Sequence, residues 1–468
     1  MKALHDIKEV YFIGIGGIGM SALARYFKAK GKKVRGYDKT ETALTKQLVG
    51  EGIEVHYEDD EKYIAKEAGI VVYTPAIPAS NRELTYYRHH HYPLLKRSDV
   101  LGEITKSSFN ICIAGTHGKT TITTMTAHLL RHSGYGCNAF LGGIAANYNS
   151  NFWSSENNVC VVEADEYDRS FLKLHPDIAV ISAMDADHLD IYGTEEEMQL
   201  AFVEFAAKVK KGGSLISKWG LKRAAALSAL QNADQQFTYS LQNNKADAYA
   251  ANITNRQGGY VFDVHTKEGW LKAVELNMGG LHNIENAVAA ITVAKRIGIE
   301  DEKIKAAMAA FRGVKRRFEY IIPPSGDSTT VYVDDYAHHP AELEALLKGA
   351  RLLFAERRCT VIFQPHLFSR TRDFGEAFAA TLDIADEVIL LPVYPARELP
   401  IAGVSSRLIF DKMKNEHKYI MDKEEALEWI KHKYGQKKPG LLITAGAGDI
   451  DQMVLQVKEI LENMNGEK

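Results

Sequence analysis

Residues 111–121, ICIAGTHGKTT, join an apolar run to a glycine-containing turn and then to a helix-forming stretch. The run from Ile111 to Ala114 predicts a buried strand, and residues 122–134 (ITTMTAHLLRHSG) predict a helix with an apolar face. A turn between a strand and a helix points several backbone N–H groups and the positive end of the helix dipole at one place, which favours an anion. The sequence therefore predicts an α/β unit arranged around a phosphate-binding turn.

The side chains of this turn are typical of a loop that holds the phosphates of ATP. Lys119 brings a positive charge for the β- and γ-phosphate oxygens, and Thr120 brings a hydroxyl for Mg²⁺. The spacing is tighter than in the common GxxxxGK[ST] loop, because Ile113 stands where the first glycine would be, so an ordinary turn that happens to contain GKT is the alternative. The strand before it, the helix after it and the doubled threonine favour a nucleotide site made of Gly115, Thr116, His117, Gly118, Lys119, Thr120 and Thr121.

Length and composition are those of a large globular protein. The chain has 468 residues, which suggests about three domains. Its net charge of −3 gives no global electrostatic reason to bind nucleic acid or an anionic membrane surface, and no apolar run is long enough to cross a bilayer. The N-terminal residues do not read as a signal peptide, and the 4 cysteines are scattered as expected for buried free thiols. We therefore expect a cytoplasmic protein with neither a nucleic-acid partner nor membrane insertion.

A second glycine-rich turn lies near the N-terminus. Residues 9–13 predict a strand, which leads into GIGGIG at 14–19 and a helix, and a second strand ends at Asp38. This GxGxxG turn with an acidic residue about 20 positions later matches the dinucleotide-binding fingerprint of a βαβ unit. The glycines allow the backbone to approach a pyrophosphate, so the pattern indicates a pyrophosphate and not necessarily a nicotinamide. A tight βα turn without a ligand is the alternative.

Acidic residues follow two apolar strands of the central region. Glu163 is the third residue of the run VVEA (161–164). The run IAVIS (178–182) leads to MDADHLD at 184–190. Carboxylates at strand ends beside a phosphate loop are natural ligands of Mg²⁺. Because Mg²⁺ prefers oxygen ligands, the residue types alone leave open whether His188 is a ligand.

Two amides and several basic groups complete the candidate site. Asn283 and Asn286 lie three residues apart on one face of a predicted helix, and carboxamides can pair with the edge of adenine. Helix capping is the alternative, but it would explain only one of the two. Further on, strands predicted at 331–336 and 360–364 are followed by imidazole and basic side chains, at the strand ends where α/β folds bind ligands.

Strands that alternate with helices predict an α/β protein with parallel sheets. Junctions near residue 106 and after Gly313 divide it into an N-terminal Rossmann-like domain (1–106), a central P-loop ATPase-like domain (107–314) and a C-terminal Rossmann-like domain (315–468). A pyrophosphate turn followed by an ATP loop suggests a ligase that activates one substrate with ATP. An NAD-dependent dehydrogenase, suggested by the first turn and Asp38, and a P-loop switch or assembly protein are alternatives from other classes.

Eight motifs spread over all three domains resemble the Mur ligase family of peptidoglycan synthesis. They are GIGGIGMS (14–21), GTHGKTT (115–121), EADE (163–166), DADHLDIYG (185–193), HNIEN (282–286), RRFE (316–319), DDYAHHP (334–340) and QPHLFSRT (364–371). Their order along the chain is the order in the family, and eight separate motifs are more than chance agreement provides.

The resemblance implies a role for each group of residues. The first turn would bind the UDP of UDP-N-acetylmuramate through Gly14, Gly16, Gly17, Gly19, Met20, Ser21 and Asp38. Lys119 would hold the ATP phosphates, and the Mg²⁺ ligands would be Thr120, Glu163 and His188. The adenine would meet Asn283 and Asn286, and the C-terminal domain would hold the nucleotide through Arg317 and Asp335. The muramyl carboxylate and the incoming L-alanine would face His338, His366 and Arg370, which with Lys119 are the predicted catalytic residues.

The implied reaction adds L-alanine to the lactyl carboxylate of UDP-N-acetylmuramate through an acyl phosphate, with ATP and Mg²⁺, in a monomer or homodimer whose C-terminal domain closes over ATP. A histidine such as His338 or His366 is the expected base for the amine. The motifs GIGGIGMS and DDYAHHP favour this activity, whereas EADEYD also occurs in the related ligase that recycles murein tripeptide, which stays an alternative. Two residues depart from the family pattern, Leu367 in place of a frequent Arg and Tyr167 in place of a frequent Ser.

Overall fold

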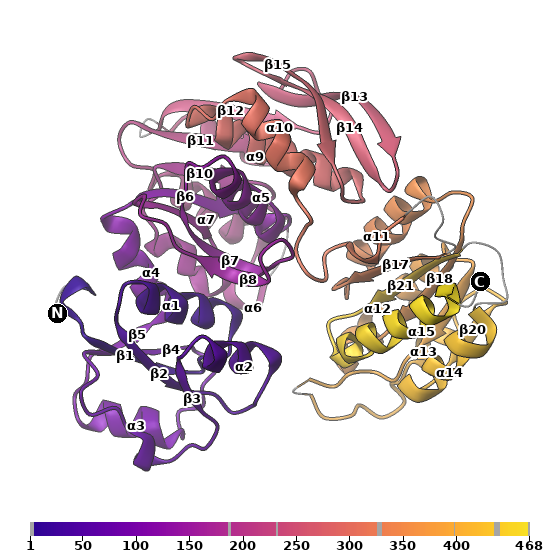
Figure 1. The fold of residues 1–468 in the computed structure, drawn as a ribbon, viewed down its shortest axis with the longest axis horizontal. Helices are drawn as coiled ribbons and strands as arrows, with labels where there is room; N and C mark the ends of the chain where they lie inside the picture. The colour runs from indigo at the N-terminus through magenta and orange to yellow at the C-terminus, as the bar shows by residue number, and fades with distance from the viewer. Residues whose placement is uncertain are drawn as a thin grey trace. The chain divides into compact units, whose positions relative to one another are not determined.

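The computed structural model describes residues 4–185, 189–230, 233–324, 330–396, 398–434 and 440–466. These residues form three β-sheets with five, ten and six strands, accompanied by helices (Figure 1). The predicted α/β class is confirmed, with a Rossmann-like sheet at each end of the chain and a P-loop-type sheet in the middle. The domain limits proposed from the sequence stay predictions.

The first sheet has the strand order β3-β2-β1-β4-β5, and all neighbours are parallel. All five residues of β1 are buried, as expected for the central strand of a parallel sheet. The strand order reverses beside β1, so the turn after β1 lies where such sheets bind ligands. The strands are β1 (Glu9–Ile13), β2 (Lys33–Tyr37), β3 (Glu54–His56), β4 (Ile70–Tyr73) and β5 (Leu94–Lys96), and the helices are η1 (Leu4–Asp6), α1 (Ile18–Ala29), α2 (Ala43–Gly50), η2 (Glu61–Tyr63), α3 (Arg82–His89) and α4 (Arg97–Lys106).

The second sheet has the order β15-β14-β13-β12-β11-β10-β6-β9-β7-β8. Its strand β6 lies between β10 and β9 and is parallel to both, so the turn after β6 again lies at a switch point. The strands are β6 (Phe109–Ala114), β7 (Asn138–Ala145), β8 (Ser150–Trp153), β9 (Val159–Glu163), β10 (Ile178–Ile181), β11 (Gly213–Lys218), β12 (Ala233–Ser240), β13 (Ala248–Arg256), β14 (Gly259–Thr266) and β15 (Gly269–Leu276). The helices are α5 (Lys119–His132), η3 (Tyr167–Lys173), α6 (Leu189–Tyr192), α7 (Glu195–Ala206), α8 (Ala224–Ser228), α9 (Leu281–Arg296) and α10 (Asp301–Ala310).

Helix α1 joins the first sheet to the second, because it also packs against β7 and β8 (Figure 1). The ring of Tyr26 lies 5.4 Å from that of Phe140 and 6.2 Å from that of Phe152, measured between ring centroids. The buried Arg25 pairs with Glu51 at 2.7 Å and donates to the side chain of Asn151. One apolar cluster therefore runs through both sheets.

The third sheet has the order β16-β17-β21-β18-β19-β20 and is parallel except for β16. The last residues of β17 and β18 lie beside the last residue of β21, so the loops after β17 and β18 begin close together. The strands are β16 (Glu319–Ile322), β17 (Thr330–Asp335), β18 (Arg358–Phe363), β19 (Glu387–Leu390), β20 (Lys418–Ile420) and β21 (Gly440–Ala445). The helices are α11 (Pro340–Leu353), α12 (Phe368–Leu382), α13 (Arg407–Phe410), α14 (Lys423–Lys433), η5 (Asp449–Met453) and α15 (Val454–Gly466).

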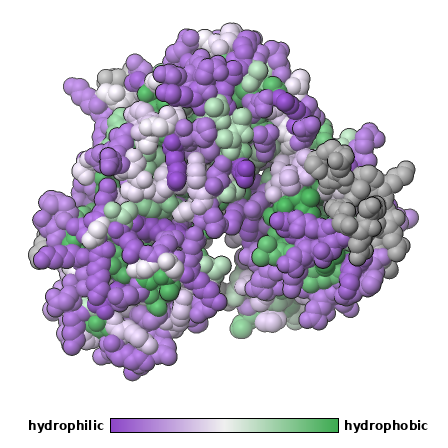
Figure 2. Space-filling view, viewed as in Figure 1, coloured by the Kyte–Doolittle hydropathy of each residue, from purple (hydrophilic) through white to green (hydrophobic). Residues whose placement is uncertain are grey.

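The chain forms two compact units. The first unit contains residues Met1–Ala251, Val264–Lys272 and Glu285–Met308, and the second contains Asn252–Asp263, Ala273–Ile284 and Ala309–Lys468. The second unit has its own apolar cluster around Tyr332 and Trp429. On the face drawn in Figure 2 hydrophilic residues predominate, as expected when the apolar residues fill such cores.

Two predictions from composition can be compared with the structure. The four cysteines are buried free thiols, as predicted. Among the helices of the described residues, none is both long and apolar enough to cross a membrane.

Candidate active site

The turn between β6 and α5 has a backbone that needs glycine at two positions. Gly115 has φ 139° and Gly118 has φ 80°, both in the region that side chains rarely adopt. A Cβ atom on Gly115 would collide with the hydroxyl of Ser182, and a Cβ on Gly118 would lie 2.8 Å from the Oδ1 atom of Asn286. The turn is therefore packed closely against the segment that follows β10 and against α9.

Lys119 is the first residue of α5, and its ammonium group folds back over the turn. Its Nζ atom donates to the carbonyl of Gly115 at 2.7 Å and to Oε1 of Glu166 at 2.8 Å. Glu166 is buried, and the hydroxyl of Tyr192 donates to its carbonyl at 2.6 Å. The lysine charge is thus held within the turn by a buried carboxylate, and a phosphate would compete with that carboxylate for it.

Thr120 and Glu163 bring two oxygen donors together beside the turn. The Thr120 hydroxyl donates to Oε1 of Glu163 at 2.9 Å, and the backbone N–H of Gly142 donates to Oε2 at 2.9 Å. Burial raises the pKa of Glu163. Strand pairing explains the placement, because Glu163 at the end of β9 lies opposite Ile113 in β6. The third predicted metal ligand, His188, lies outside the described residues.

The other residues of the turn are held by the segment after β10. The backbone N–H of Thr116 donates to Ala183 at 3.2 Å, and its hydroxyl accepts from the N–H of Asp185 at 3.1 Å. The carbonyl of His117 accepts from Ser182, and its exposed ring lies 3.7 Å from the carboxylate of Asp185. Thr121 is buried in the first turn of α5. These contacts fix the turn at the carboxyl end of the sheet.

The GxGxxG turn after β1 is closed by hydrogen bonds within the first sheet. Gly14 and Ile15 both donate to the carbonyl of Tyr37, and Gly17 donates to Gly14. The N–H of Gly16 donates to Oδ2 of Asp38 at 2.7 Å. The predicted acidic residue therefore contacts the turn itself, at the end of β2.

Two predicted residues of α1 point into the protein. Met20 and Ser21 are buried, and the Ser21 hydroxyl accepts from the amide of Asn151 at 3.0 Å. Their side chains therefore hold α1 against its neighbours, and α1 offers a ligand the backbone of its first turn.

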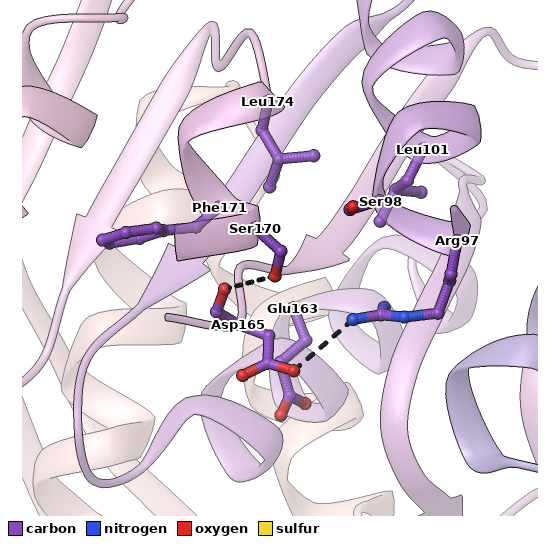
Figure 3. Close-up of a pocket in the computed structure, with 8 residues that line it drawn as sticks. All are labelled: Arg97, Ser98, Leu101, Glu163, Asp165, Ser170, Phe171 and Leu174. Atoms are coloured by element: carbon purple, nitrogen blue, oxygen red, sulfur yellow. Dashed lines mark hydrogen bonds and ion pairs between the residues drawn. The ribbon is translucent and has the colours of Figure 1, made fainter. Parts of the chain in front are cut away.

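Arg97 connects the first turn to the acidic strand end, and the sequence interpretation did not include it. A Cβ atom on Gly19 would lie 2.9 Å from Cδ of Arg97, and the guanidinium reaches Asp165 at 3.4 Å (Figure 3). The small hollow around this pair is lined by Arg97, Ser98, Leu101, Glu163, Asp165, Ser170, Phe171 and Leu174. The positively charged side chain of Arg97 thus lies between the predicted pyrophosphate turn and the predicted metal ligand Glu163.

The predicted adenine residues Asn283 and Asn286 are both in the first turns of α9. The side-chain amide of Asn283 donates to the carbonyl of Gly279 at 2.6 Å, so it bonds to the backbone just before its own helix. Asn286 lies against Gly118 of the phosphate loop. The structure therefore brings Asn286 to the loop, and both adenine contacts stay predictions.

The second unit gathers the predicted residues of the C-terminal domain at the ends of β17 and β18. His338 lies in the loop before α11, with Nδ1 at 2.9 Å from the carbonyl of Tyr336 and 3.3 Å from Glu342. The ring centroid of His366 is 5.9 Å from that of His338. Nδ1 of His366 accepts from Arg370 at 3.4 Å, and its ring stacks on Tyr394 at 5.8 Å.

Asp335 and Arg317 lie in the same part of the second unit. Asp335 accepts from the N–H of Phe318 at 2.6 Å and from that of Ala337 at 2.7 Å, and burial raises its pKa to about 6. The guanidinium carbon of Arg317 is 5.8 Å from the ring centroid of Tyr336. Leu367, the departure noted in the sequence, has φ 70° and lies directly before α12, and its N–H donates to the carbonyl of Tyr394 at 2.9 Å.

The predicted site residues thus form two groups. In the first unit the phosphate loop, Glu163 and Asn286 lie together, with Glu166 as an additional partner that follows the same apolar strand. In the second unit Arg317, Asp335, His338, His366 and Arg370 lie together, with Glu342 and Tyr394 as additional partners. Among the described residues there is no group of three or more His, Cys, Asp or Glu side chains that could hold a metal ion.

Three family models match the chain in sequence order. The Mur ligase family catalytic domain matches residues 9–109, the Mur ligase middle domain matches 113–294, and the Mur ligase glutamate ligase domain matches 316–448. Together they cover most of the chain.

Individual relatives match over nearly their whole length. A UDP-N-acetylmuramate–L-alanine ligase of Porphyromonas gingivalis is 46% identical over 98% of this chain and 100% of its own length. The enzyme of that name from Parabacteroides distasonis is 48% identical over 98% of both chains. A crystal structure of UDP-N-acetylmuramate-alanine ligase from Thermotoga maritima has a TM-score of 0.81 at 26% identity, covering 99% of this chain and 100% of the other.

Proposed function

The chain belongs to the Mur ligase family, and on that premise we propose that it joins L-alanine to the lactyl carboxylate of UDP-N-acetylmuramate. It is an ATP-dependent ligase that forms a C–N bond and acts on small-molecule substrates in peptidoglycan synthesis. The full-length likeness to alanine-adding relatives supports this activity over tripeptide recycling, and the phosphate loop speaks against a dehydrogenase. We further propose a cytoplasmic monomer or homodimer with domains at 1–106, 107–314 and 315–468.

The observation that carries the proposal is the position of Lys119 at the N-terminus of α5. Its Nζ lies 2.8 Å from Glu166 and 2.7 Å from the carbonyl of Gly115, in the turn between β6 and α5. When ATP binds, the ammonium group of Lys119 leaves Glu166 and binds phosphate oxygens. The other loop residues bind the remaining negative charge of the phosphates. Asn283 and Asn286 then serve the adenine, and Arg317 and Asp335 serve the nucleotide from the second unit.

Residues that fit Mg²⁺ stand beside Lys119. Thr120 and Glu163 present a hydroxyl and a carboxylate 2.9 Å apart, and a hard cation prefers such oxygen donors. Burial raises the pKa of Glu163, so a cation next to this carboxylate would stabilise its charged form. We therefore assign Thr120 and Glu163, with His188, as the residues that would hold Mg²⁺. The ion would offset the negative charge of the phosphates.

The substrate carboxylate and ATP are both anions, so the site must offset their repulsion. In our proposal the GxGxxG turn and Asp38 bind the UDP part, through Gly14, Gly16, Gly17 and Gly19 and the first turn of α1 with Met20 and Ser21. The carboxylate attacks the γ-phosphorus and forms an acyl phosphate, while Lys119 stabilises charge on the transferred group. The L-alanine amine then attacks the carbonyl carbon and phosphate leaves, with His338, His366 and Arg370 around the amino acid.

Substitution of Lys119 by Ala tests the phosphate-loop role. We expect turnover, measured as phosphate release with ATP, UDP-N-acetylmuramate and L-alanine, to fall by about 10²–10³-fold, because a charge that stabilises the transferred group is lost. Circular dichroism and thermal unfolding should stay close to those of the wild type. The control is Lys222→Ala, which removes an exposed lysine of the same unit that pairs with Glu195.

The wild type should release phosphate only when both UDP-N-acetylmuramate and L-alanine are present. Hydrolysis of ATP without them would support a P-loop switch instead. Turnover of Lys119→Ala close to that of Lys222→Ala would contradict the assignment of the loop.

A further inference from the structure

His338 and His366, the two predicted catalytic histidines, differ in which ring nitrogen carries the hydrogen. Nδ1 of His338 is 2.9 Å from the carbonyl oxygen of Tyr336 and 3.3 Å from Oε2 of Glu342. Both neighbours are acceptors, so Nδ1 must be the N–H of the neutral ring. The lone pair is then on Nε2, and among the described residues none forms a hydrogen bond with that atom.

His366 has the opposite arrangement. Its Nδ1 lies 3.4 Å from Nη1 of Arg370, and a guanidinium can only donate. Nδ1 of His366 is therefore the acceptor, and its hydrogen is on Nε2. Burial is the main cause that lowers the pKa of His366 to about 4, with further contributions from His338 and Arg370, so the ring is neutral near neutral pH.

Glu342 is fixed in a position where it can only accept from His338. Its Oε2 accepts the backbone N–H of His338 at 3.0 Å and that of His339 at 3.2 Å, at the start of α11. Burial is the main cause that lowers the pKa of His338 below its ordinary value. Arg370 and Arg317 add to this lowering, whereas Glu342 and the hydrogen bond to Tyr336 oppose it. The carboxylate thus both orients the ring and supplies the one nearby negative charge among these groups.

From this geometry we infer that His338 is the base that takes a proton from the incoming amine at Nε2, and that Glu342 is its positioning residue. The inference rests on the proposed function and deepens it, because the alternatives His338 and His366 are now separated. The side chain of His338 is 22% exposed, so a ligand can approach it.

The L-alanine ammonium gives one proton to Nε2 of His338, and the neutral amine forms the C–N bond at the carbonyl carbon of the acyl phosphate. The tetrahedral intermediate then breaks its C–O bond to phosphate, and the electron pair leaves with phosphate. The second nitrogen proton goes to that phosphate, and His338 releases its proton to solvent.

Nitrogen-15 NMR of the imidazole rings tests the tautomers without any turnover. In the neutral wild type we expect Nδ1–H for His338 and Nε2–H for His366. Glu342→Gln should increase the Nε2–H form of His338, and the matched control Glu344→Gln, an exposed residue of the same helix that pairs with Lys348, should not. Nε2–H for His338 in the wild type would overturn the inference.

Hydroxylamine tests the base, because it is largely uncharged near neutral pH and needs no base before it attacks an acyl phosphate. With L-alanine, His338→Gln should lose about 10²–10⁴-fold in kcat, and with hydroxylamine it should stay within a few-fold of the wild type. His366→Gln should lose activity with both nucleophiles in similar proportion. Glu342→Gln should follow His338→Gln with a smaller loss.

The opposite pattern, in which His366→Gln alone recovers with hydroxylamine, would overturn the inference while leaving the ligase activity intact. If the wild type forms no hydroxamate and no alanine product from UDP-N-acetylmuramate, the proposed function itself fails, and the base assignment fails with it.

Discussion

At the scale of single residues, burial raises the pKa of several carboxyl groups in this chain. Glu83 in α3 has a fully buried side chain, and its Oε2 accepts from the hydroxyl of Tyr11 at 2.6 Å. Its Oε1 has no hydrogen-bond partner within the described residues and lies 3.5 Å from Nε2 of His56. Burial is the main cause that raises the pKa of Glu83 from 4.5 to about 7. This carboxyl group therefore binds a proton more readily in the folded chain than in the unfolded chain.

Glu83 should make the folded first unit less stable as the pH rises. The folded pKa is above the unfolded value, so its contribution is complete below about pH 4.5 and is lost as the pH rises to about 7. A pKa difference of this size corresponds to roughly 3–4 kcal/mol in full, of which roughly 2–3 kcal/mol falls between pH 5 and pH 8. Urea unfolding at about pH 5 and about pH 8 should show that Glu83→Gln gains roughly this much relative to the wild type at the higher pH. Glu67→Gln, at an exposed position of the same sheet domain, is the control. An equal difference at both pH values would contradict the prediction.

The sequence predicted the residues that a motif contains but not those that the fold brings to it. Lys119, Thr120 and Glu163 lie together as the strand–turn–helix pattern implied. Arg97 was missed, because only the packing of α4 beside α1 brings it to Gly19 and Asp165. Glu342 has a signal in the sequence, since it stands four residues after His338 in the first turn of the helix that follows.

At the scale of elements, the phosphate loop depends on the left-handed backbone at the start of α5. The same helix ends before Gly134, which has φ 81° and open space where a Cβ atom would lie, whereas Gly118 has φ 80° and faces Asn286. The two glycines therefore share the backbone conformation and differ in their surroundings. This pair separates backbone strain from crowding at the site.

Gly118→Ala should be more harmful than Gly134→Ala. Each alanine costs about 1–2 kcal/mol for the left-handed backbone, but only the first also pushes its Cβ to 2.8 Å from Oδ1 of Asn286. We expect Gly118→Ala to lower the unfolding free energy further and to raise the KM for ATP severalfold. Thermal unfolding and initial rates with varied ATP measure both effects. Equal KM values for the two variants would contradict a role of this packing in nucleotide binding.

Elements that end in a motif were the easiest to predict. The strands β1, β6, β9, β10, β17 and β18 appear where apolar runs indicated them. The strands β12–β15 were not predicted. In β14, for example, more buried and less buried residues alternate, and the polar residues interrupt the apolar run that would have indicated a strand. The strands β3, β5 and β20 have three residues each, which is too short for a recognisable pattern.

At the scale of the whole molecule, the first sheet and most of the second sheet belong to the first unit and share one apolar cluster, and the second unit has a separate apolar cluster. Arg25 is the polar centre of the junction between the two sheets, with a side chain that is 6% exposed. It pairs with Glu51 and donates to Asn151, which in turn bonds Ser21 in α1. A substitution of Arg25 should therefore lower the stability of the first unit and leave that of the second unit unchanged.

Calorimetry of the full chain should resolve this difference. We expect two unfolding transitions, because the two units have separate apolar clusters. Arg25→Ala leaves Asn151 and the partly exposed Glu51 without their partner, which should cost about 2–3 kcal/mol and lower one transition by roughly 5 °C. ATP with Mg²⁺ should raise that same transition, because the phosphate loop belongs to the first unit. The other transition should stay in place in Arg25→Ala. If the variant lowers both transitions equally, the two units unfold together, and the first unit has no stability independent of the second.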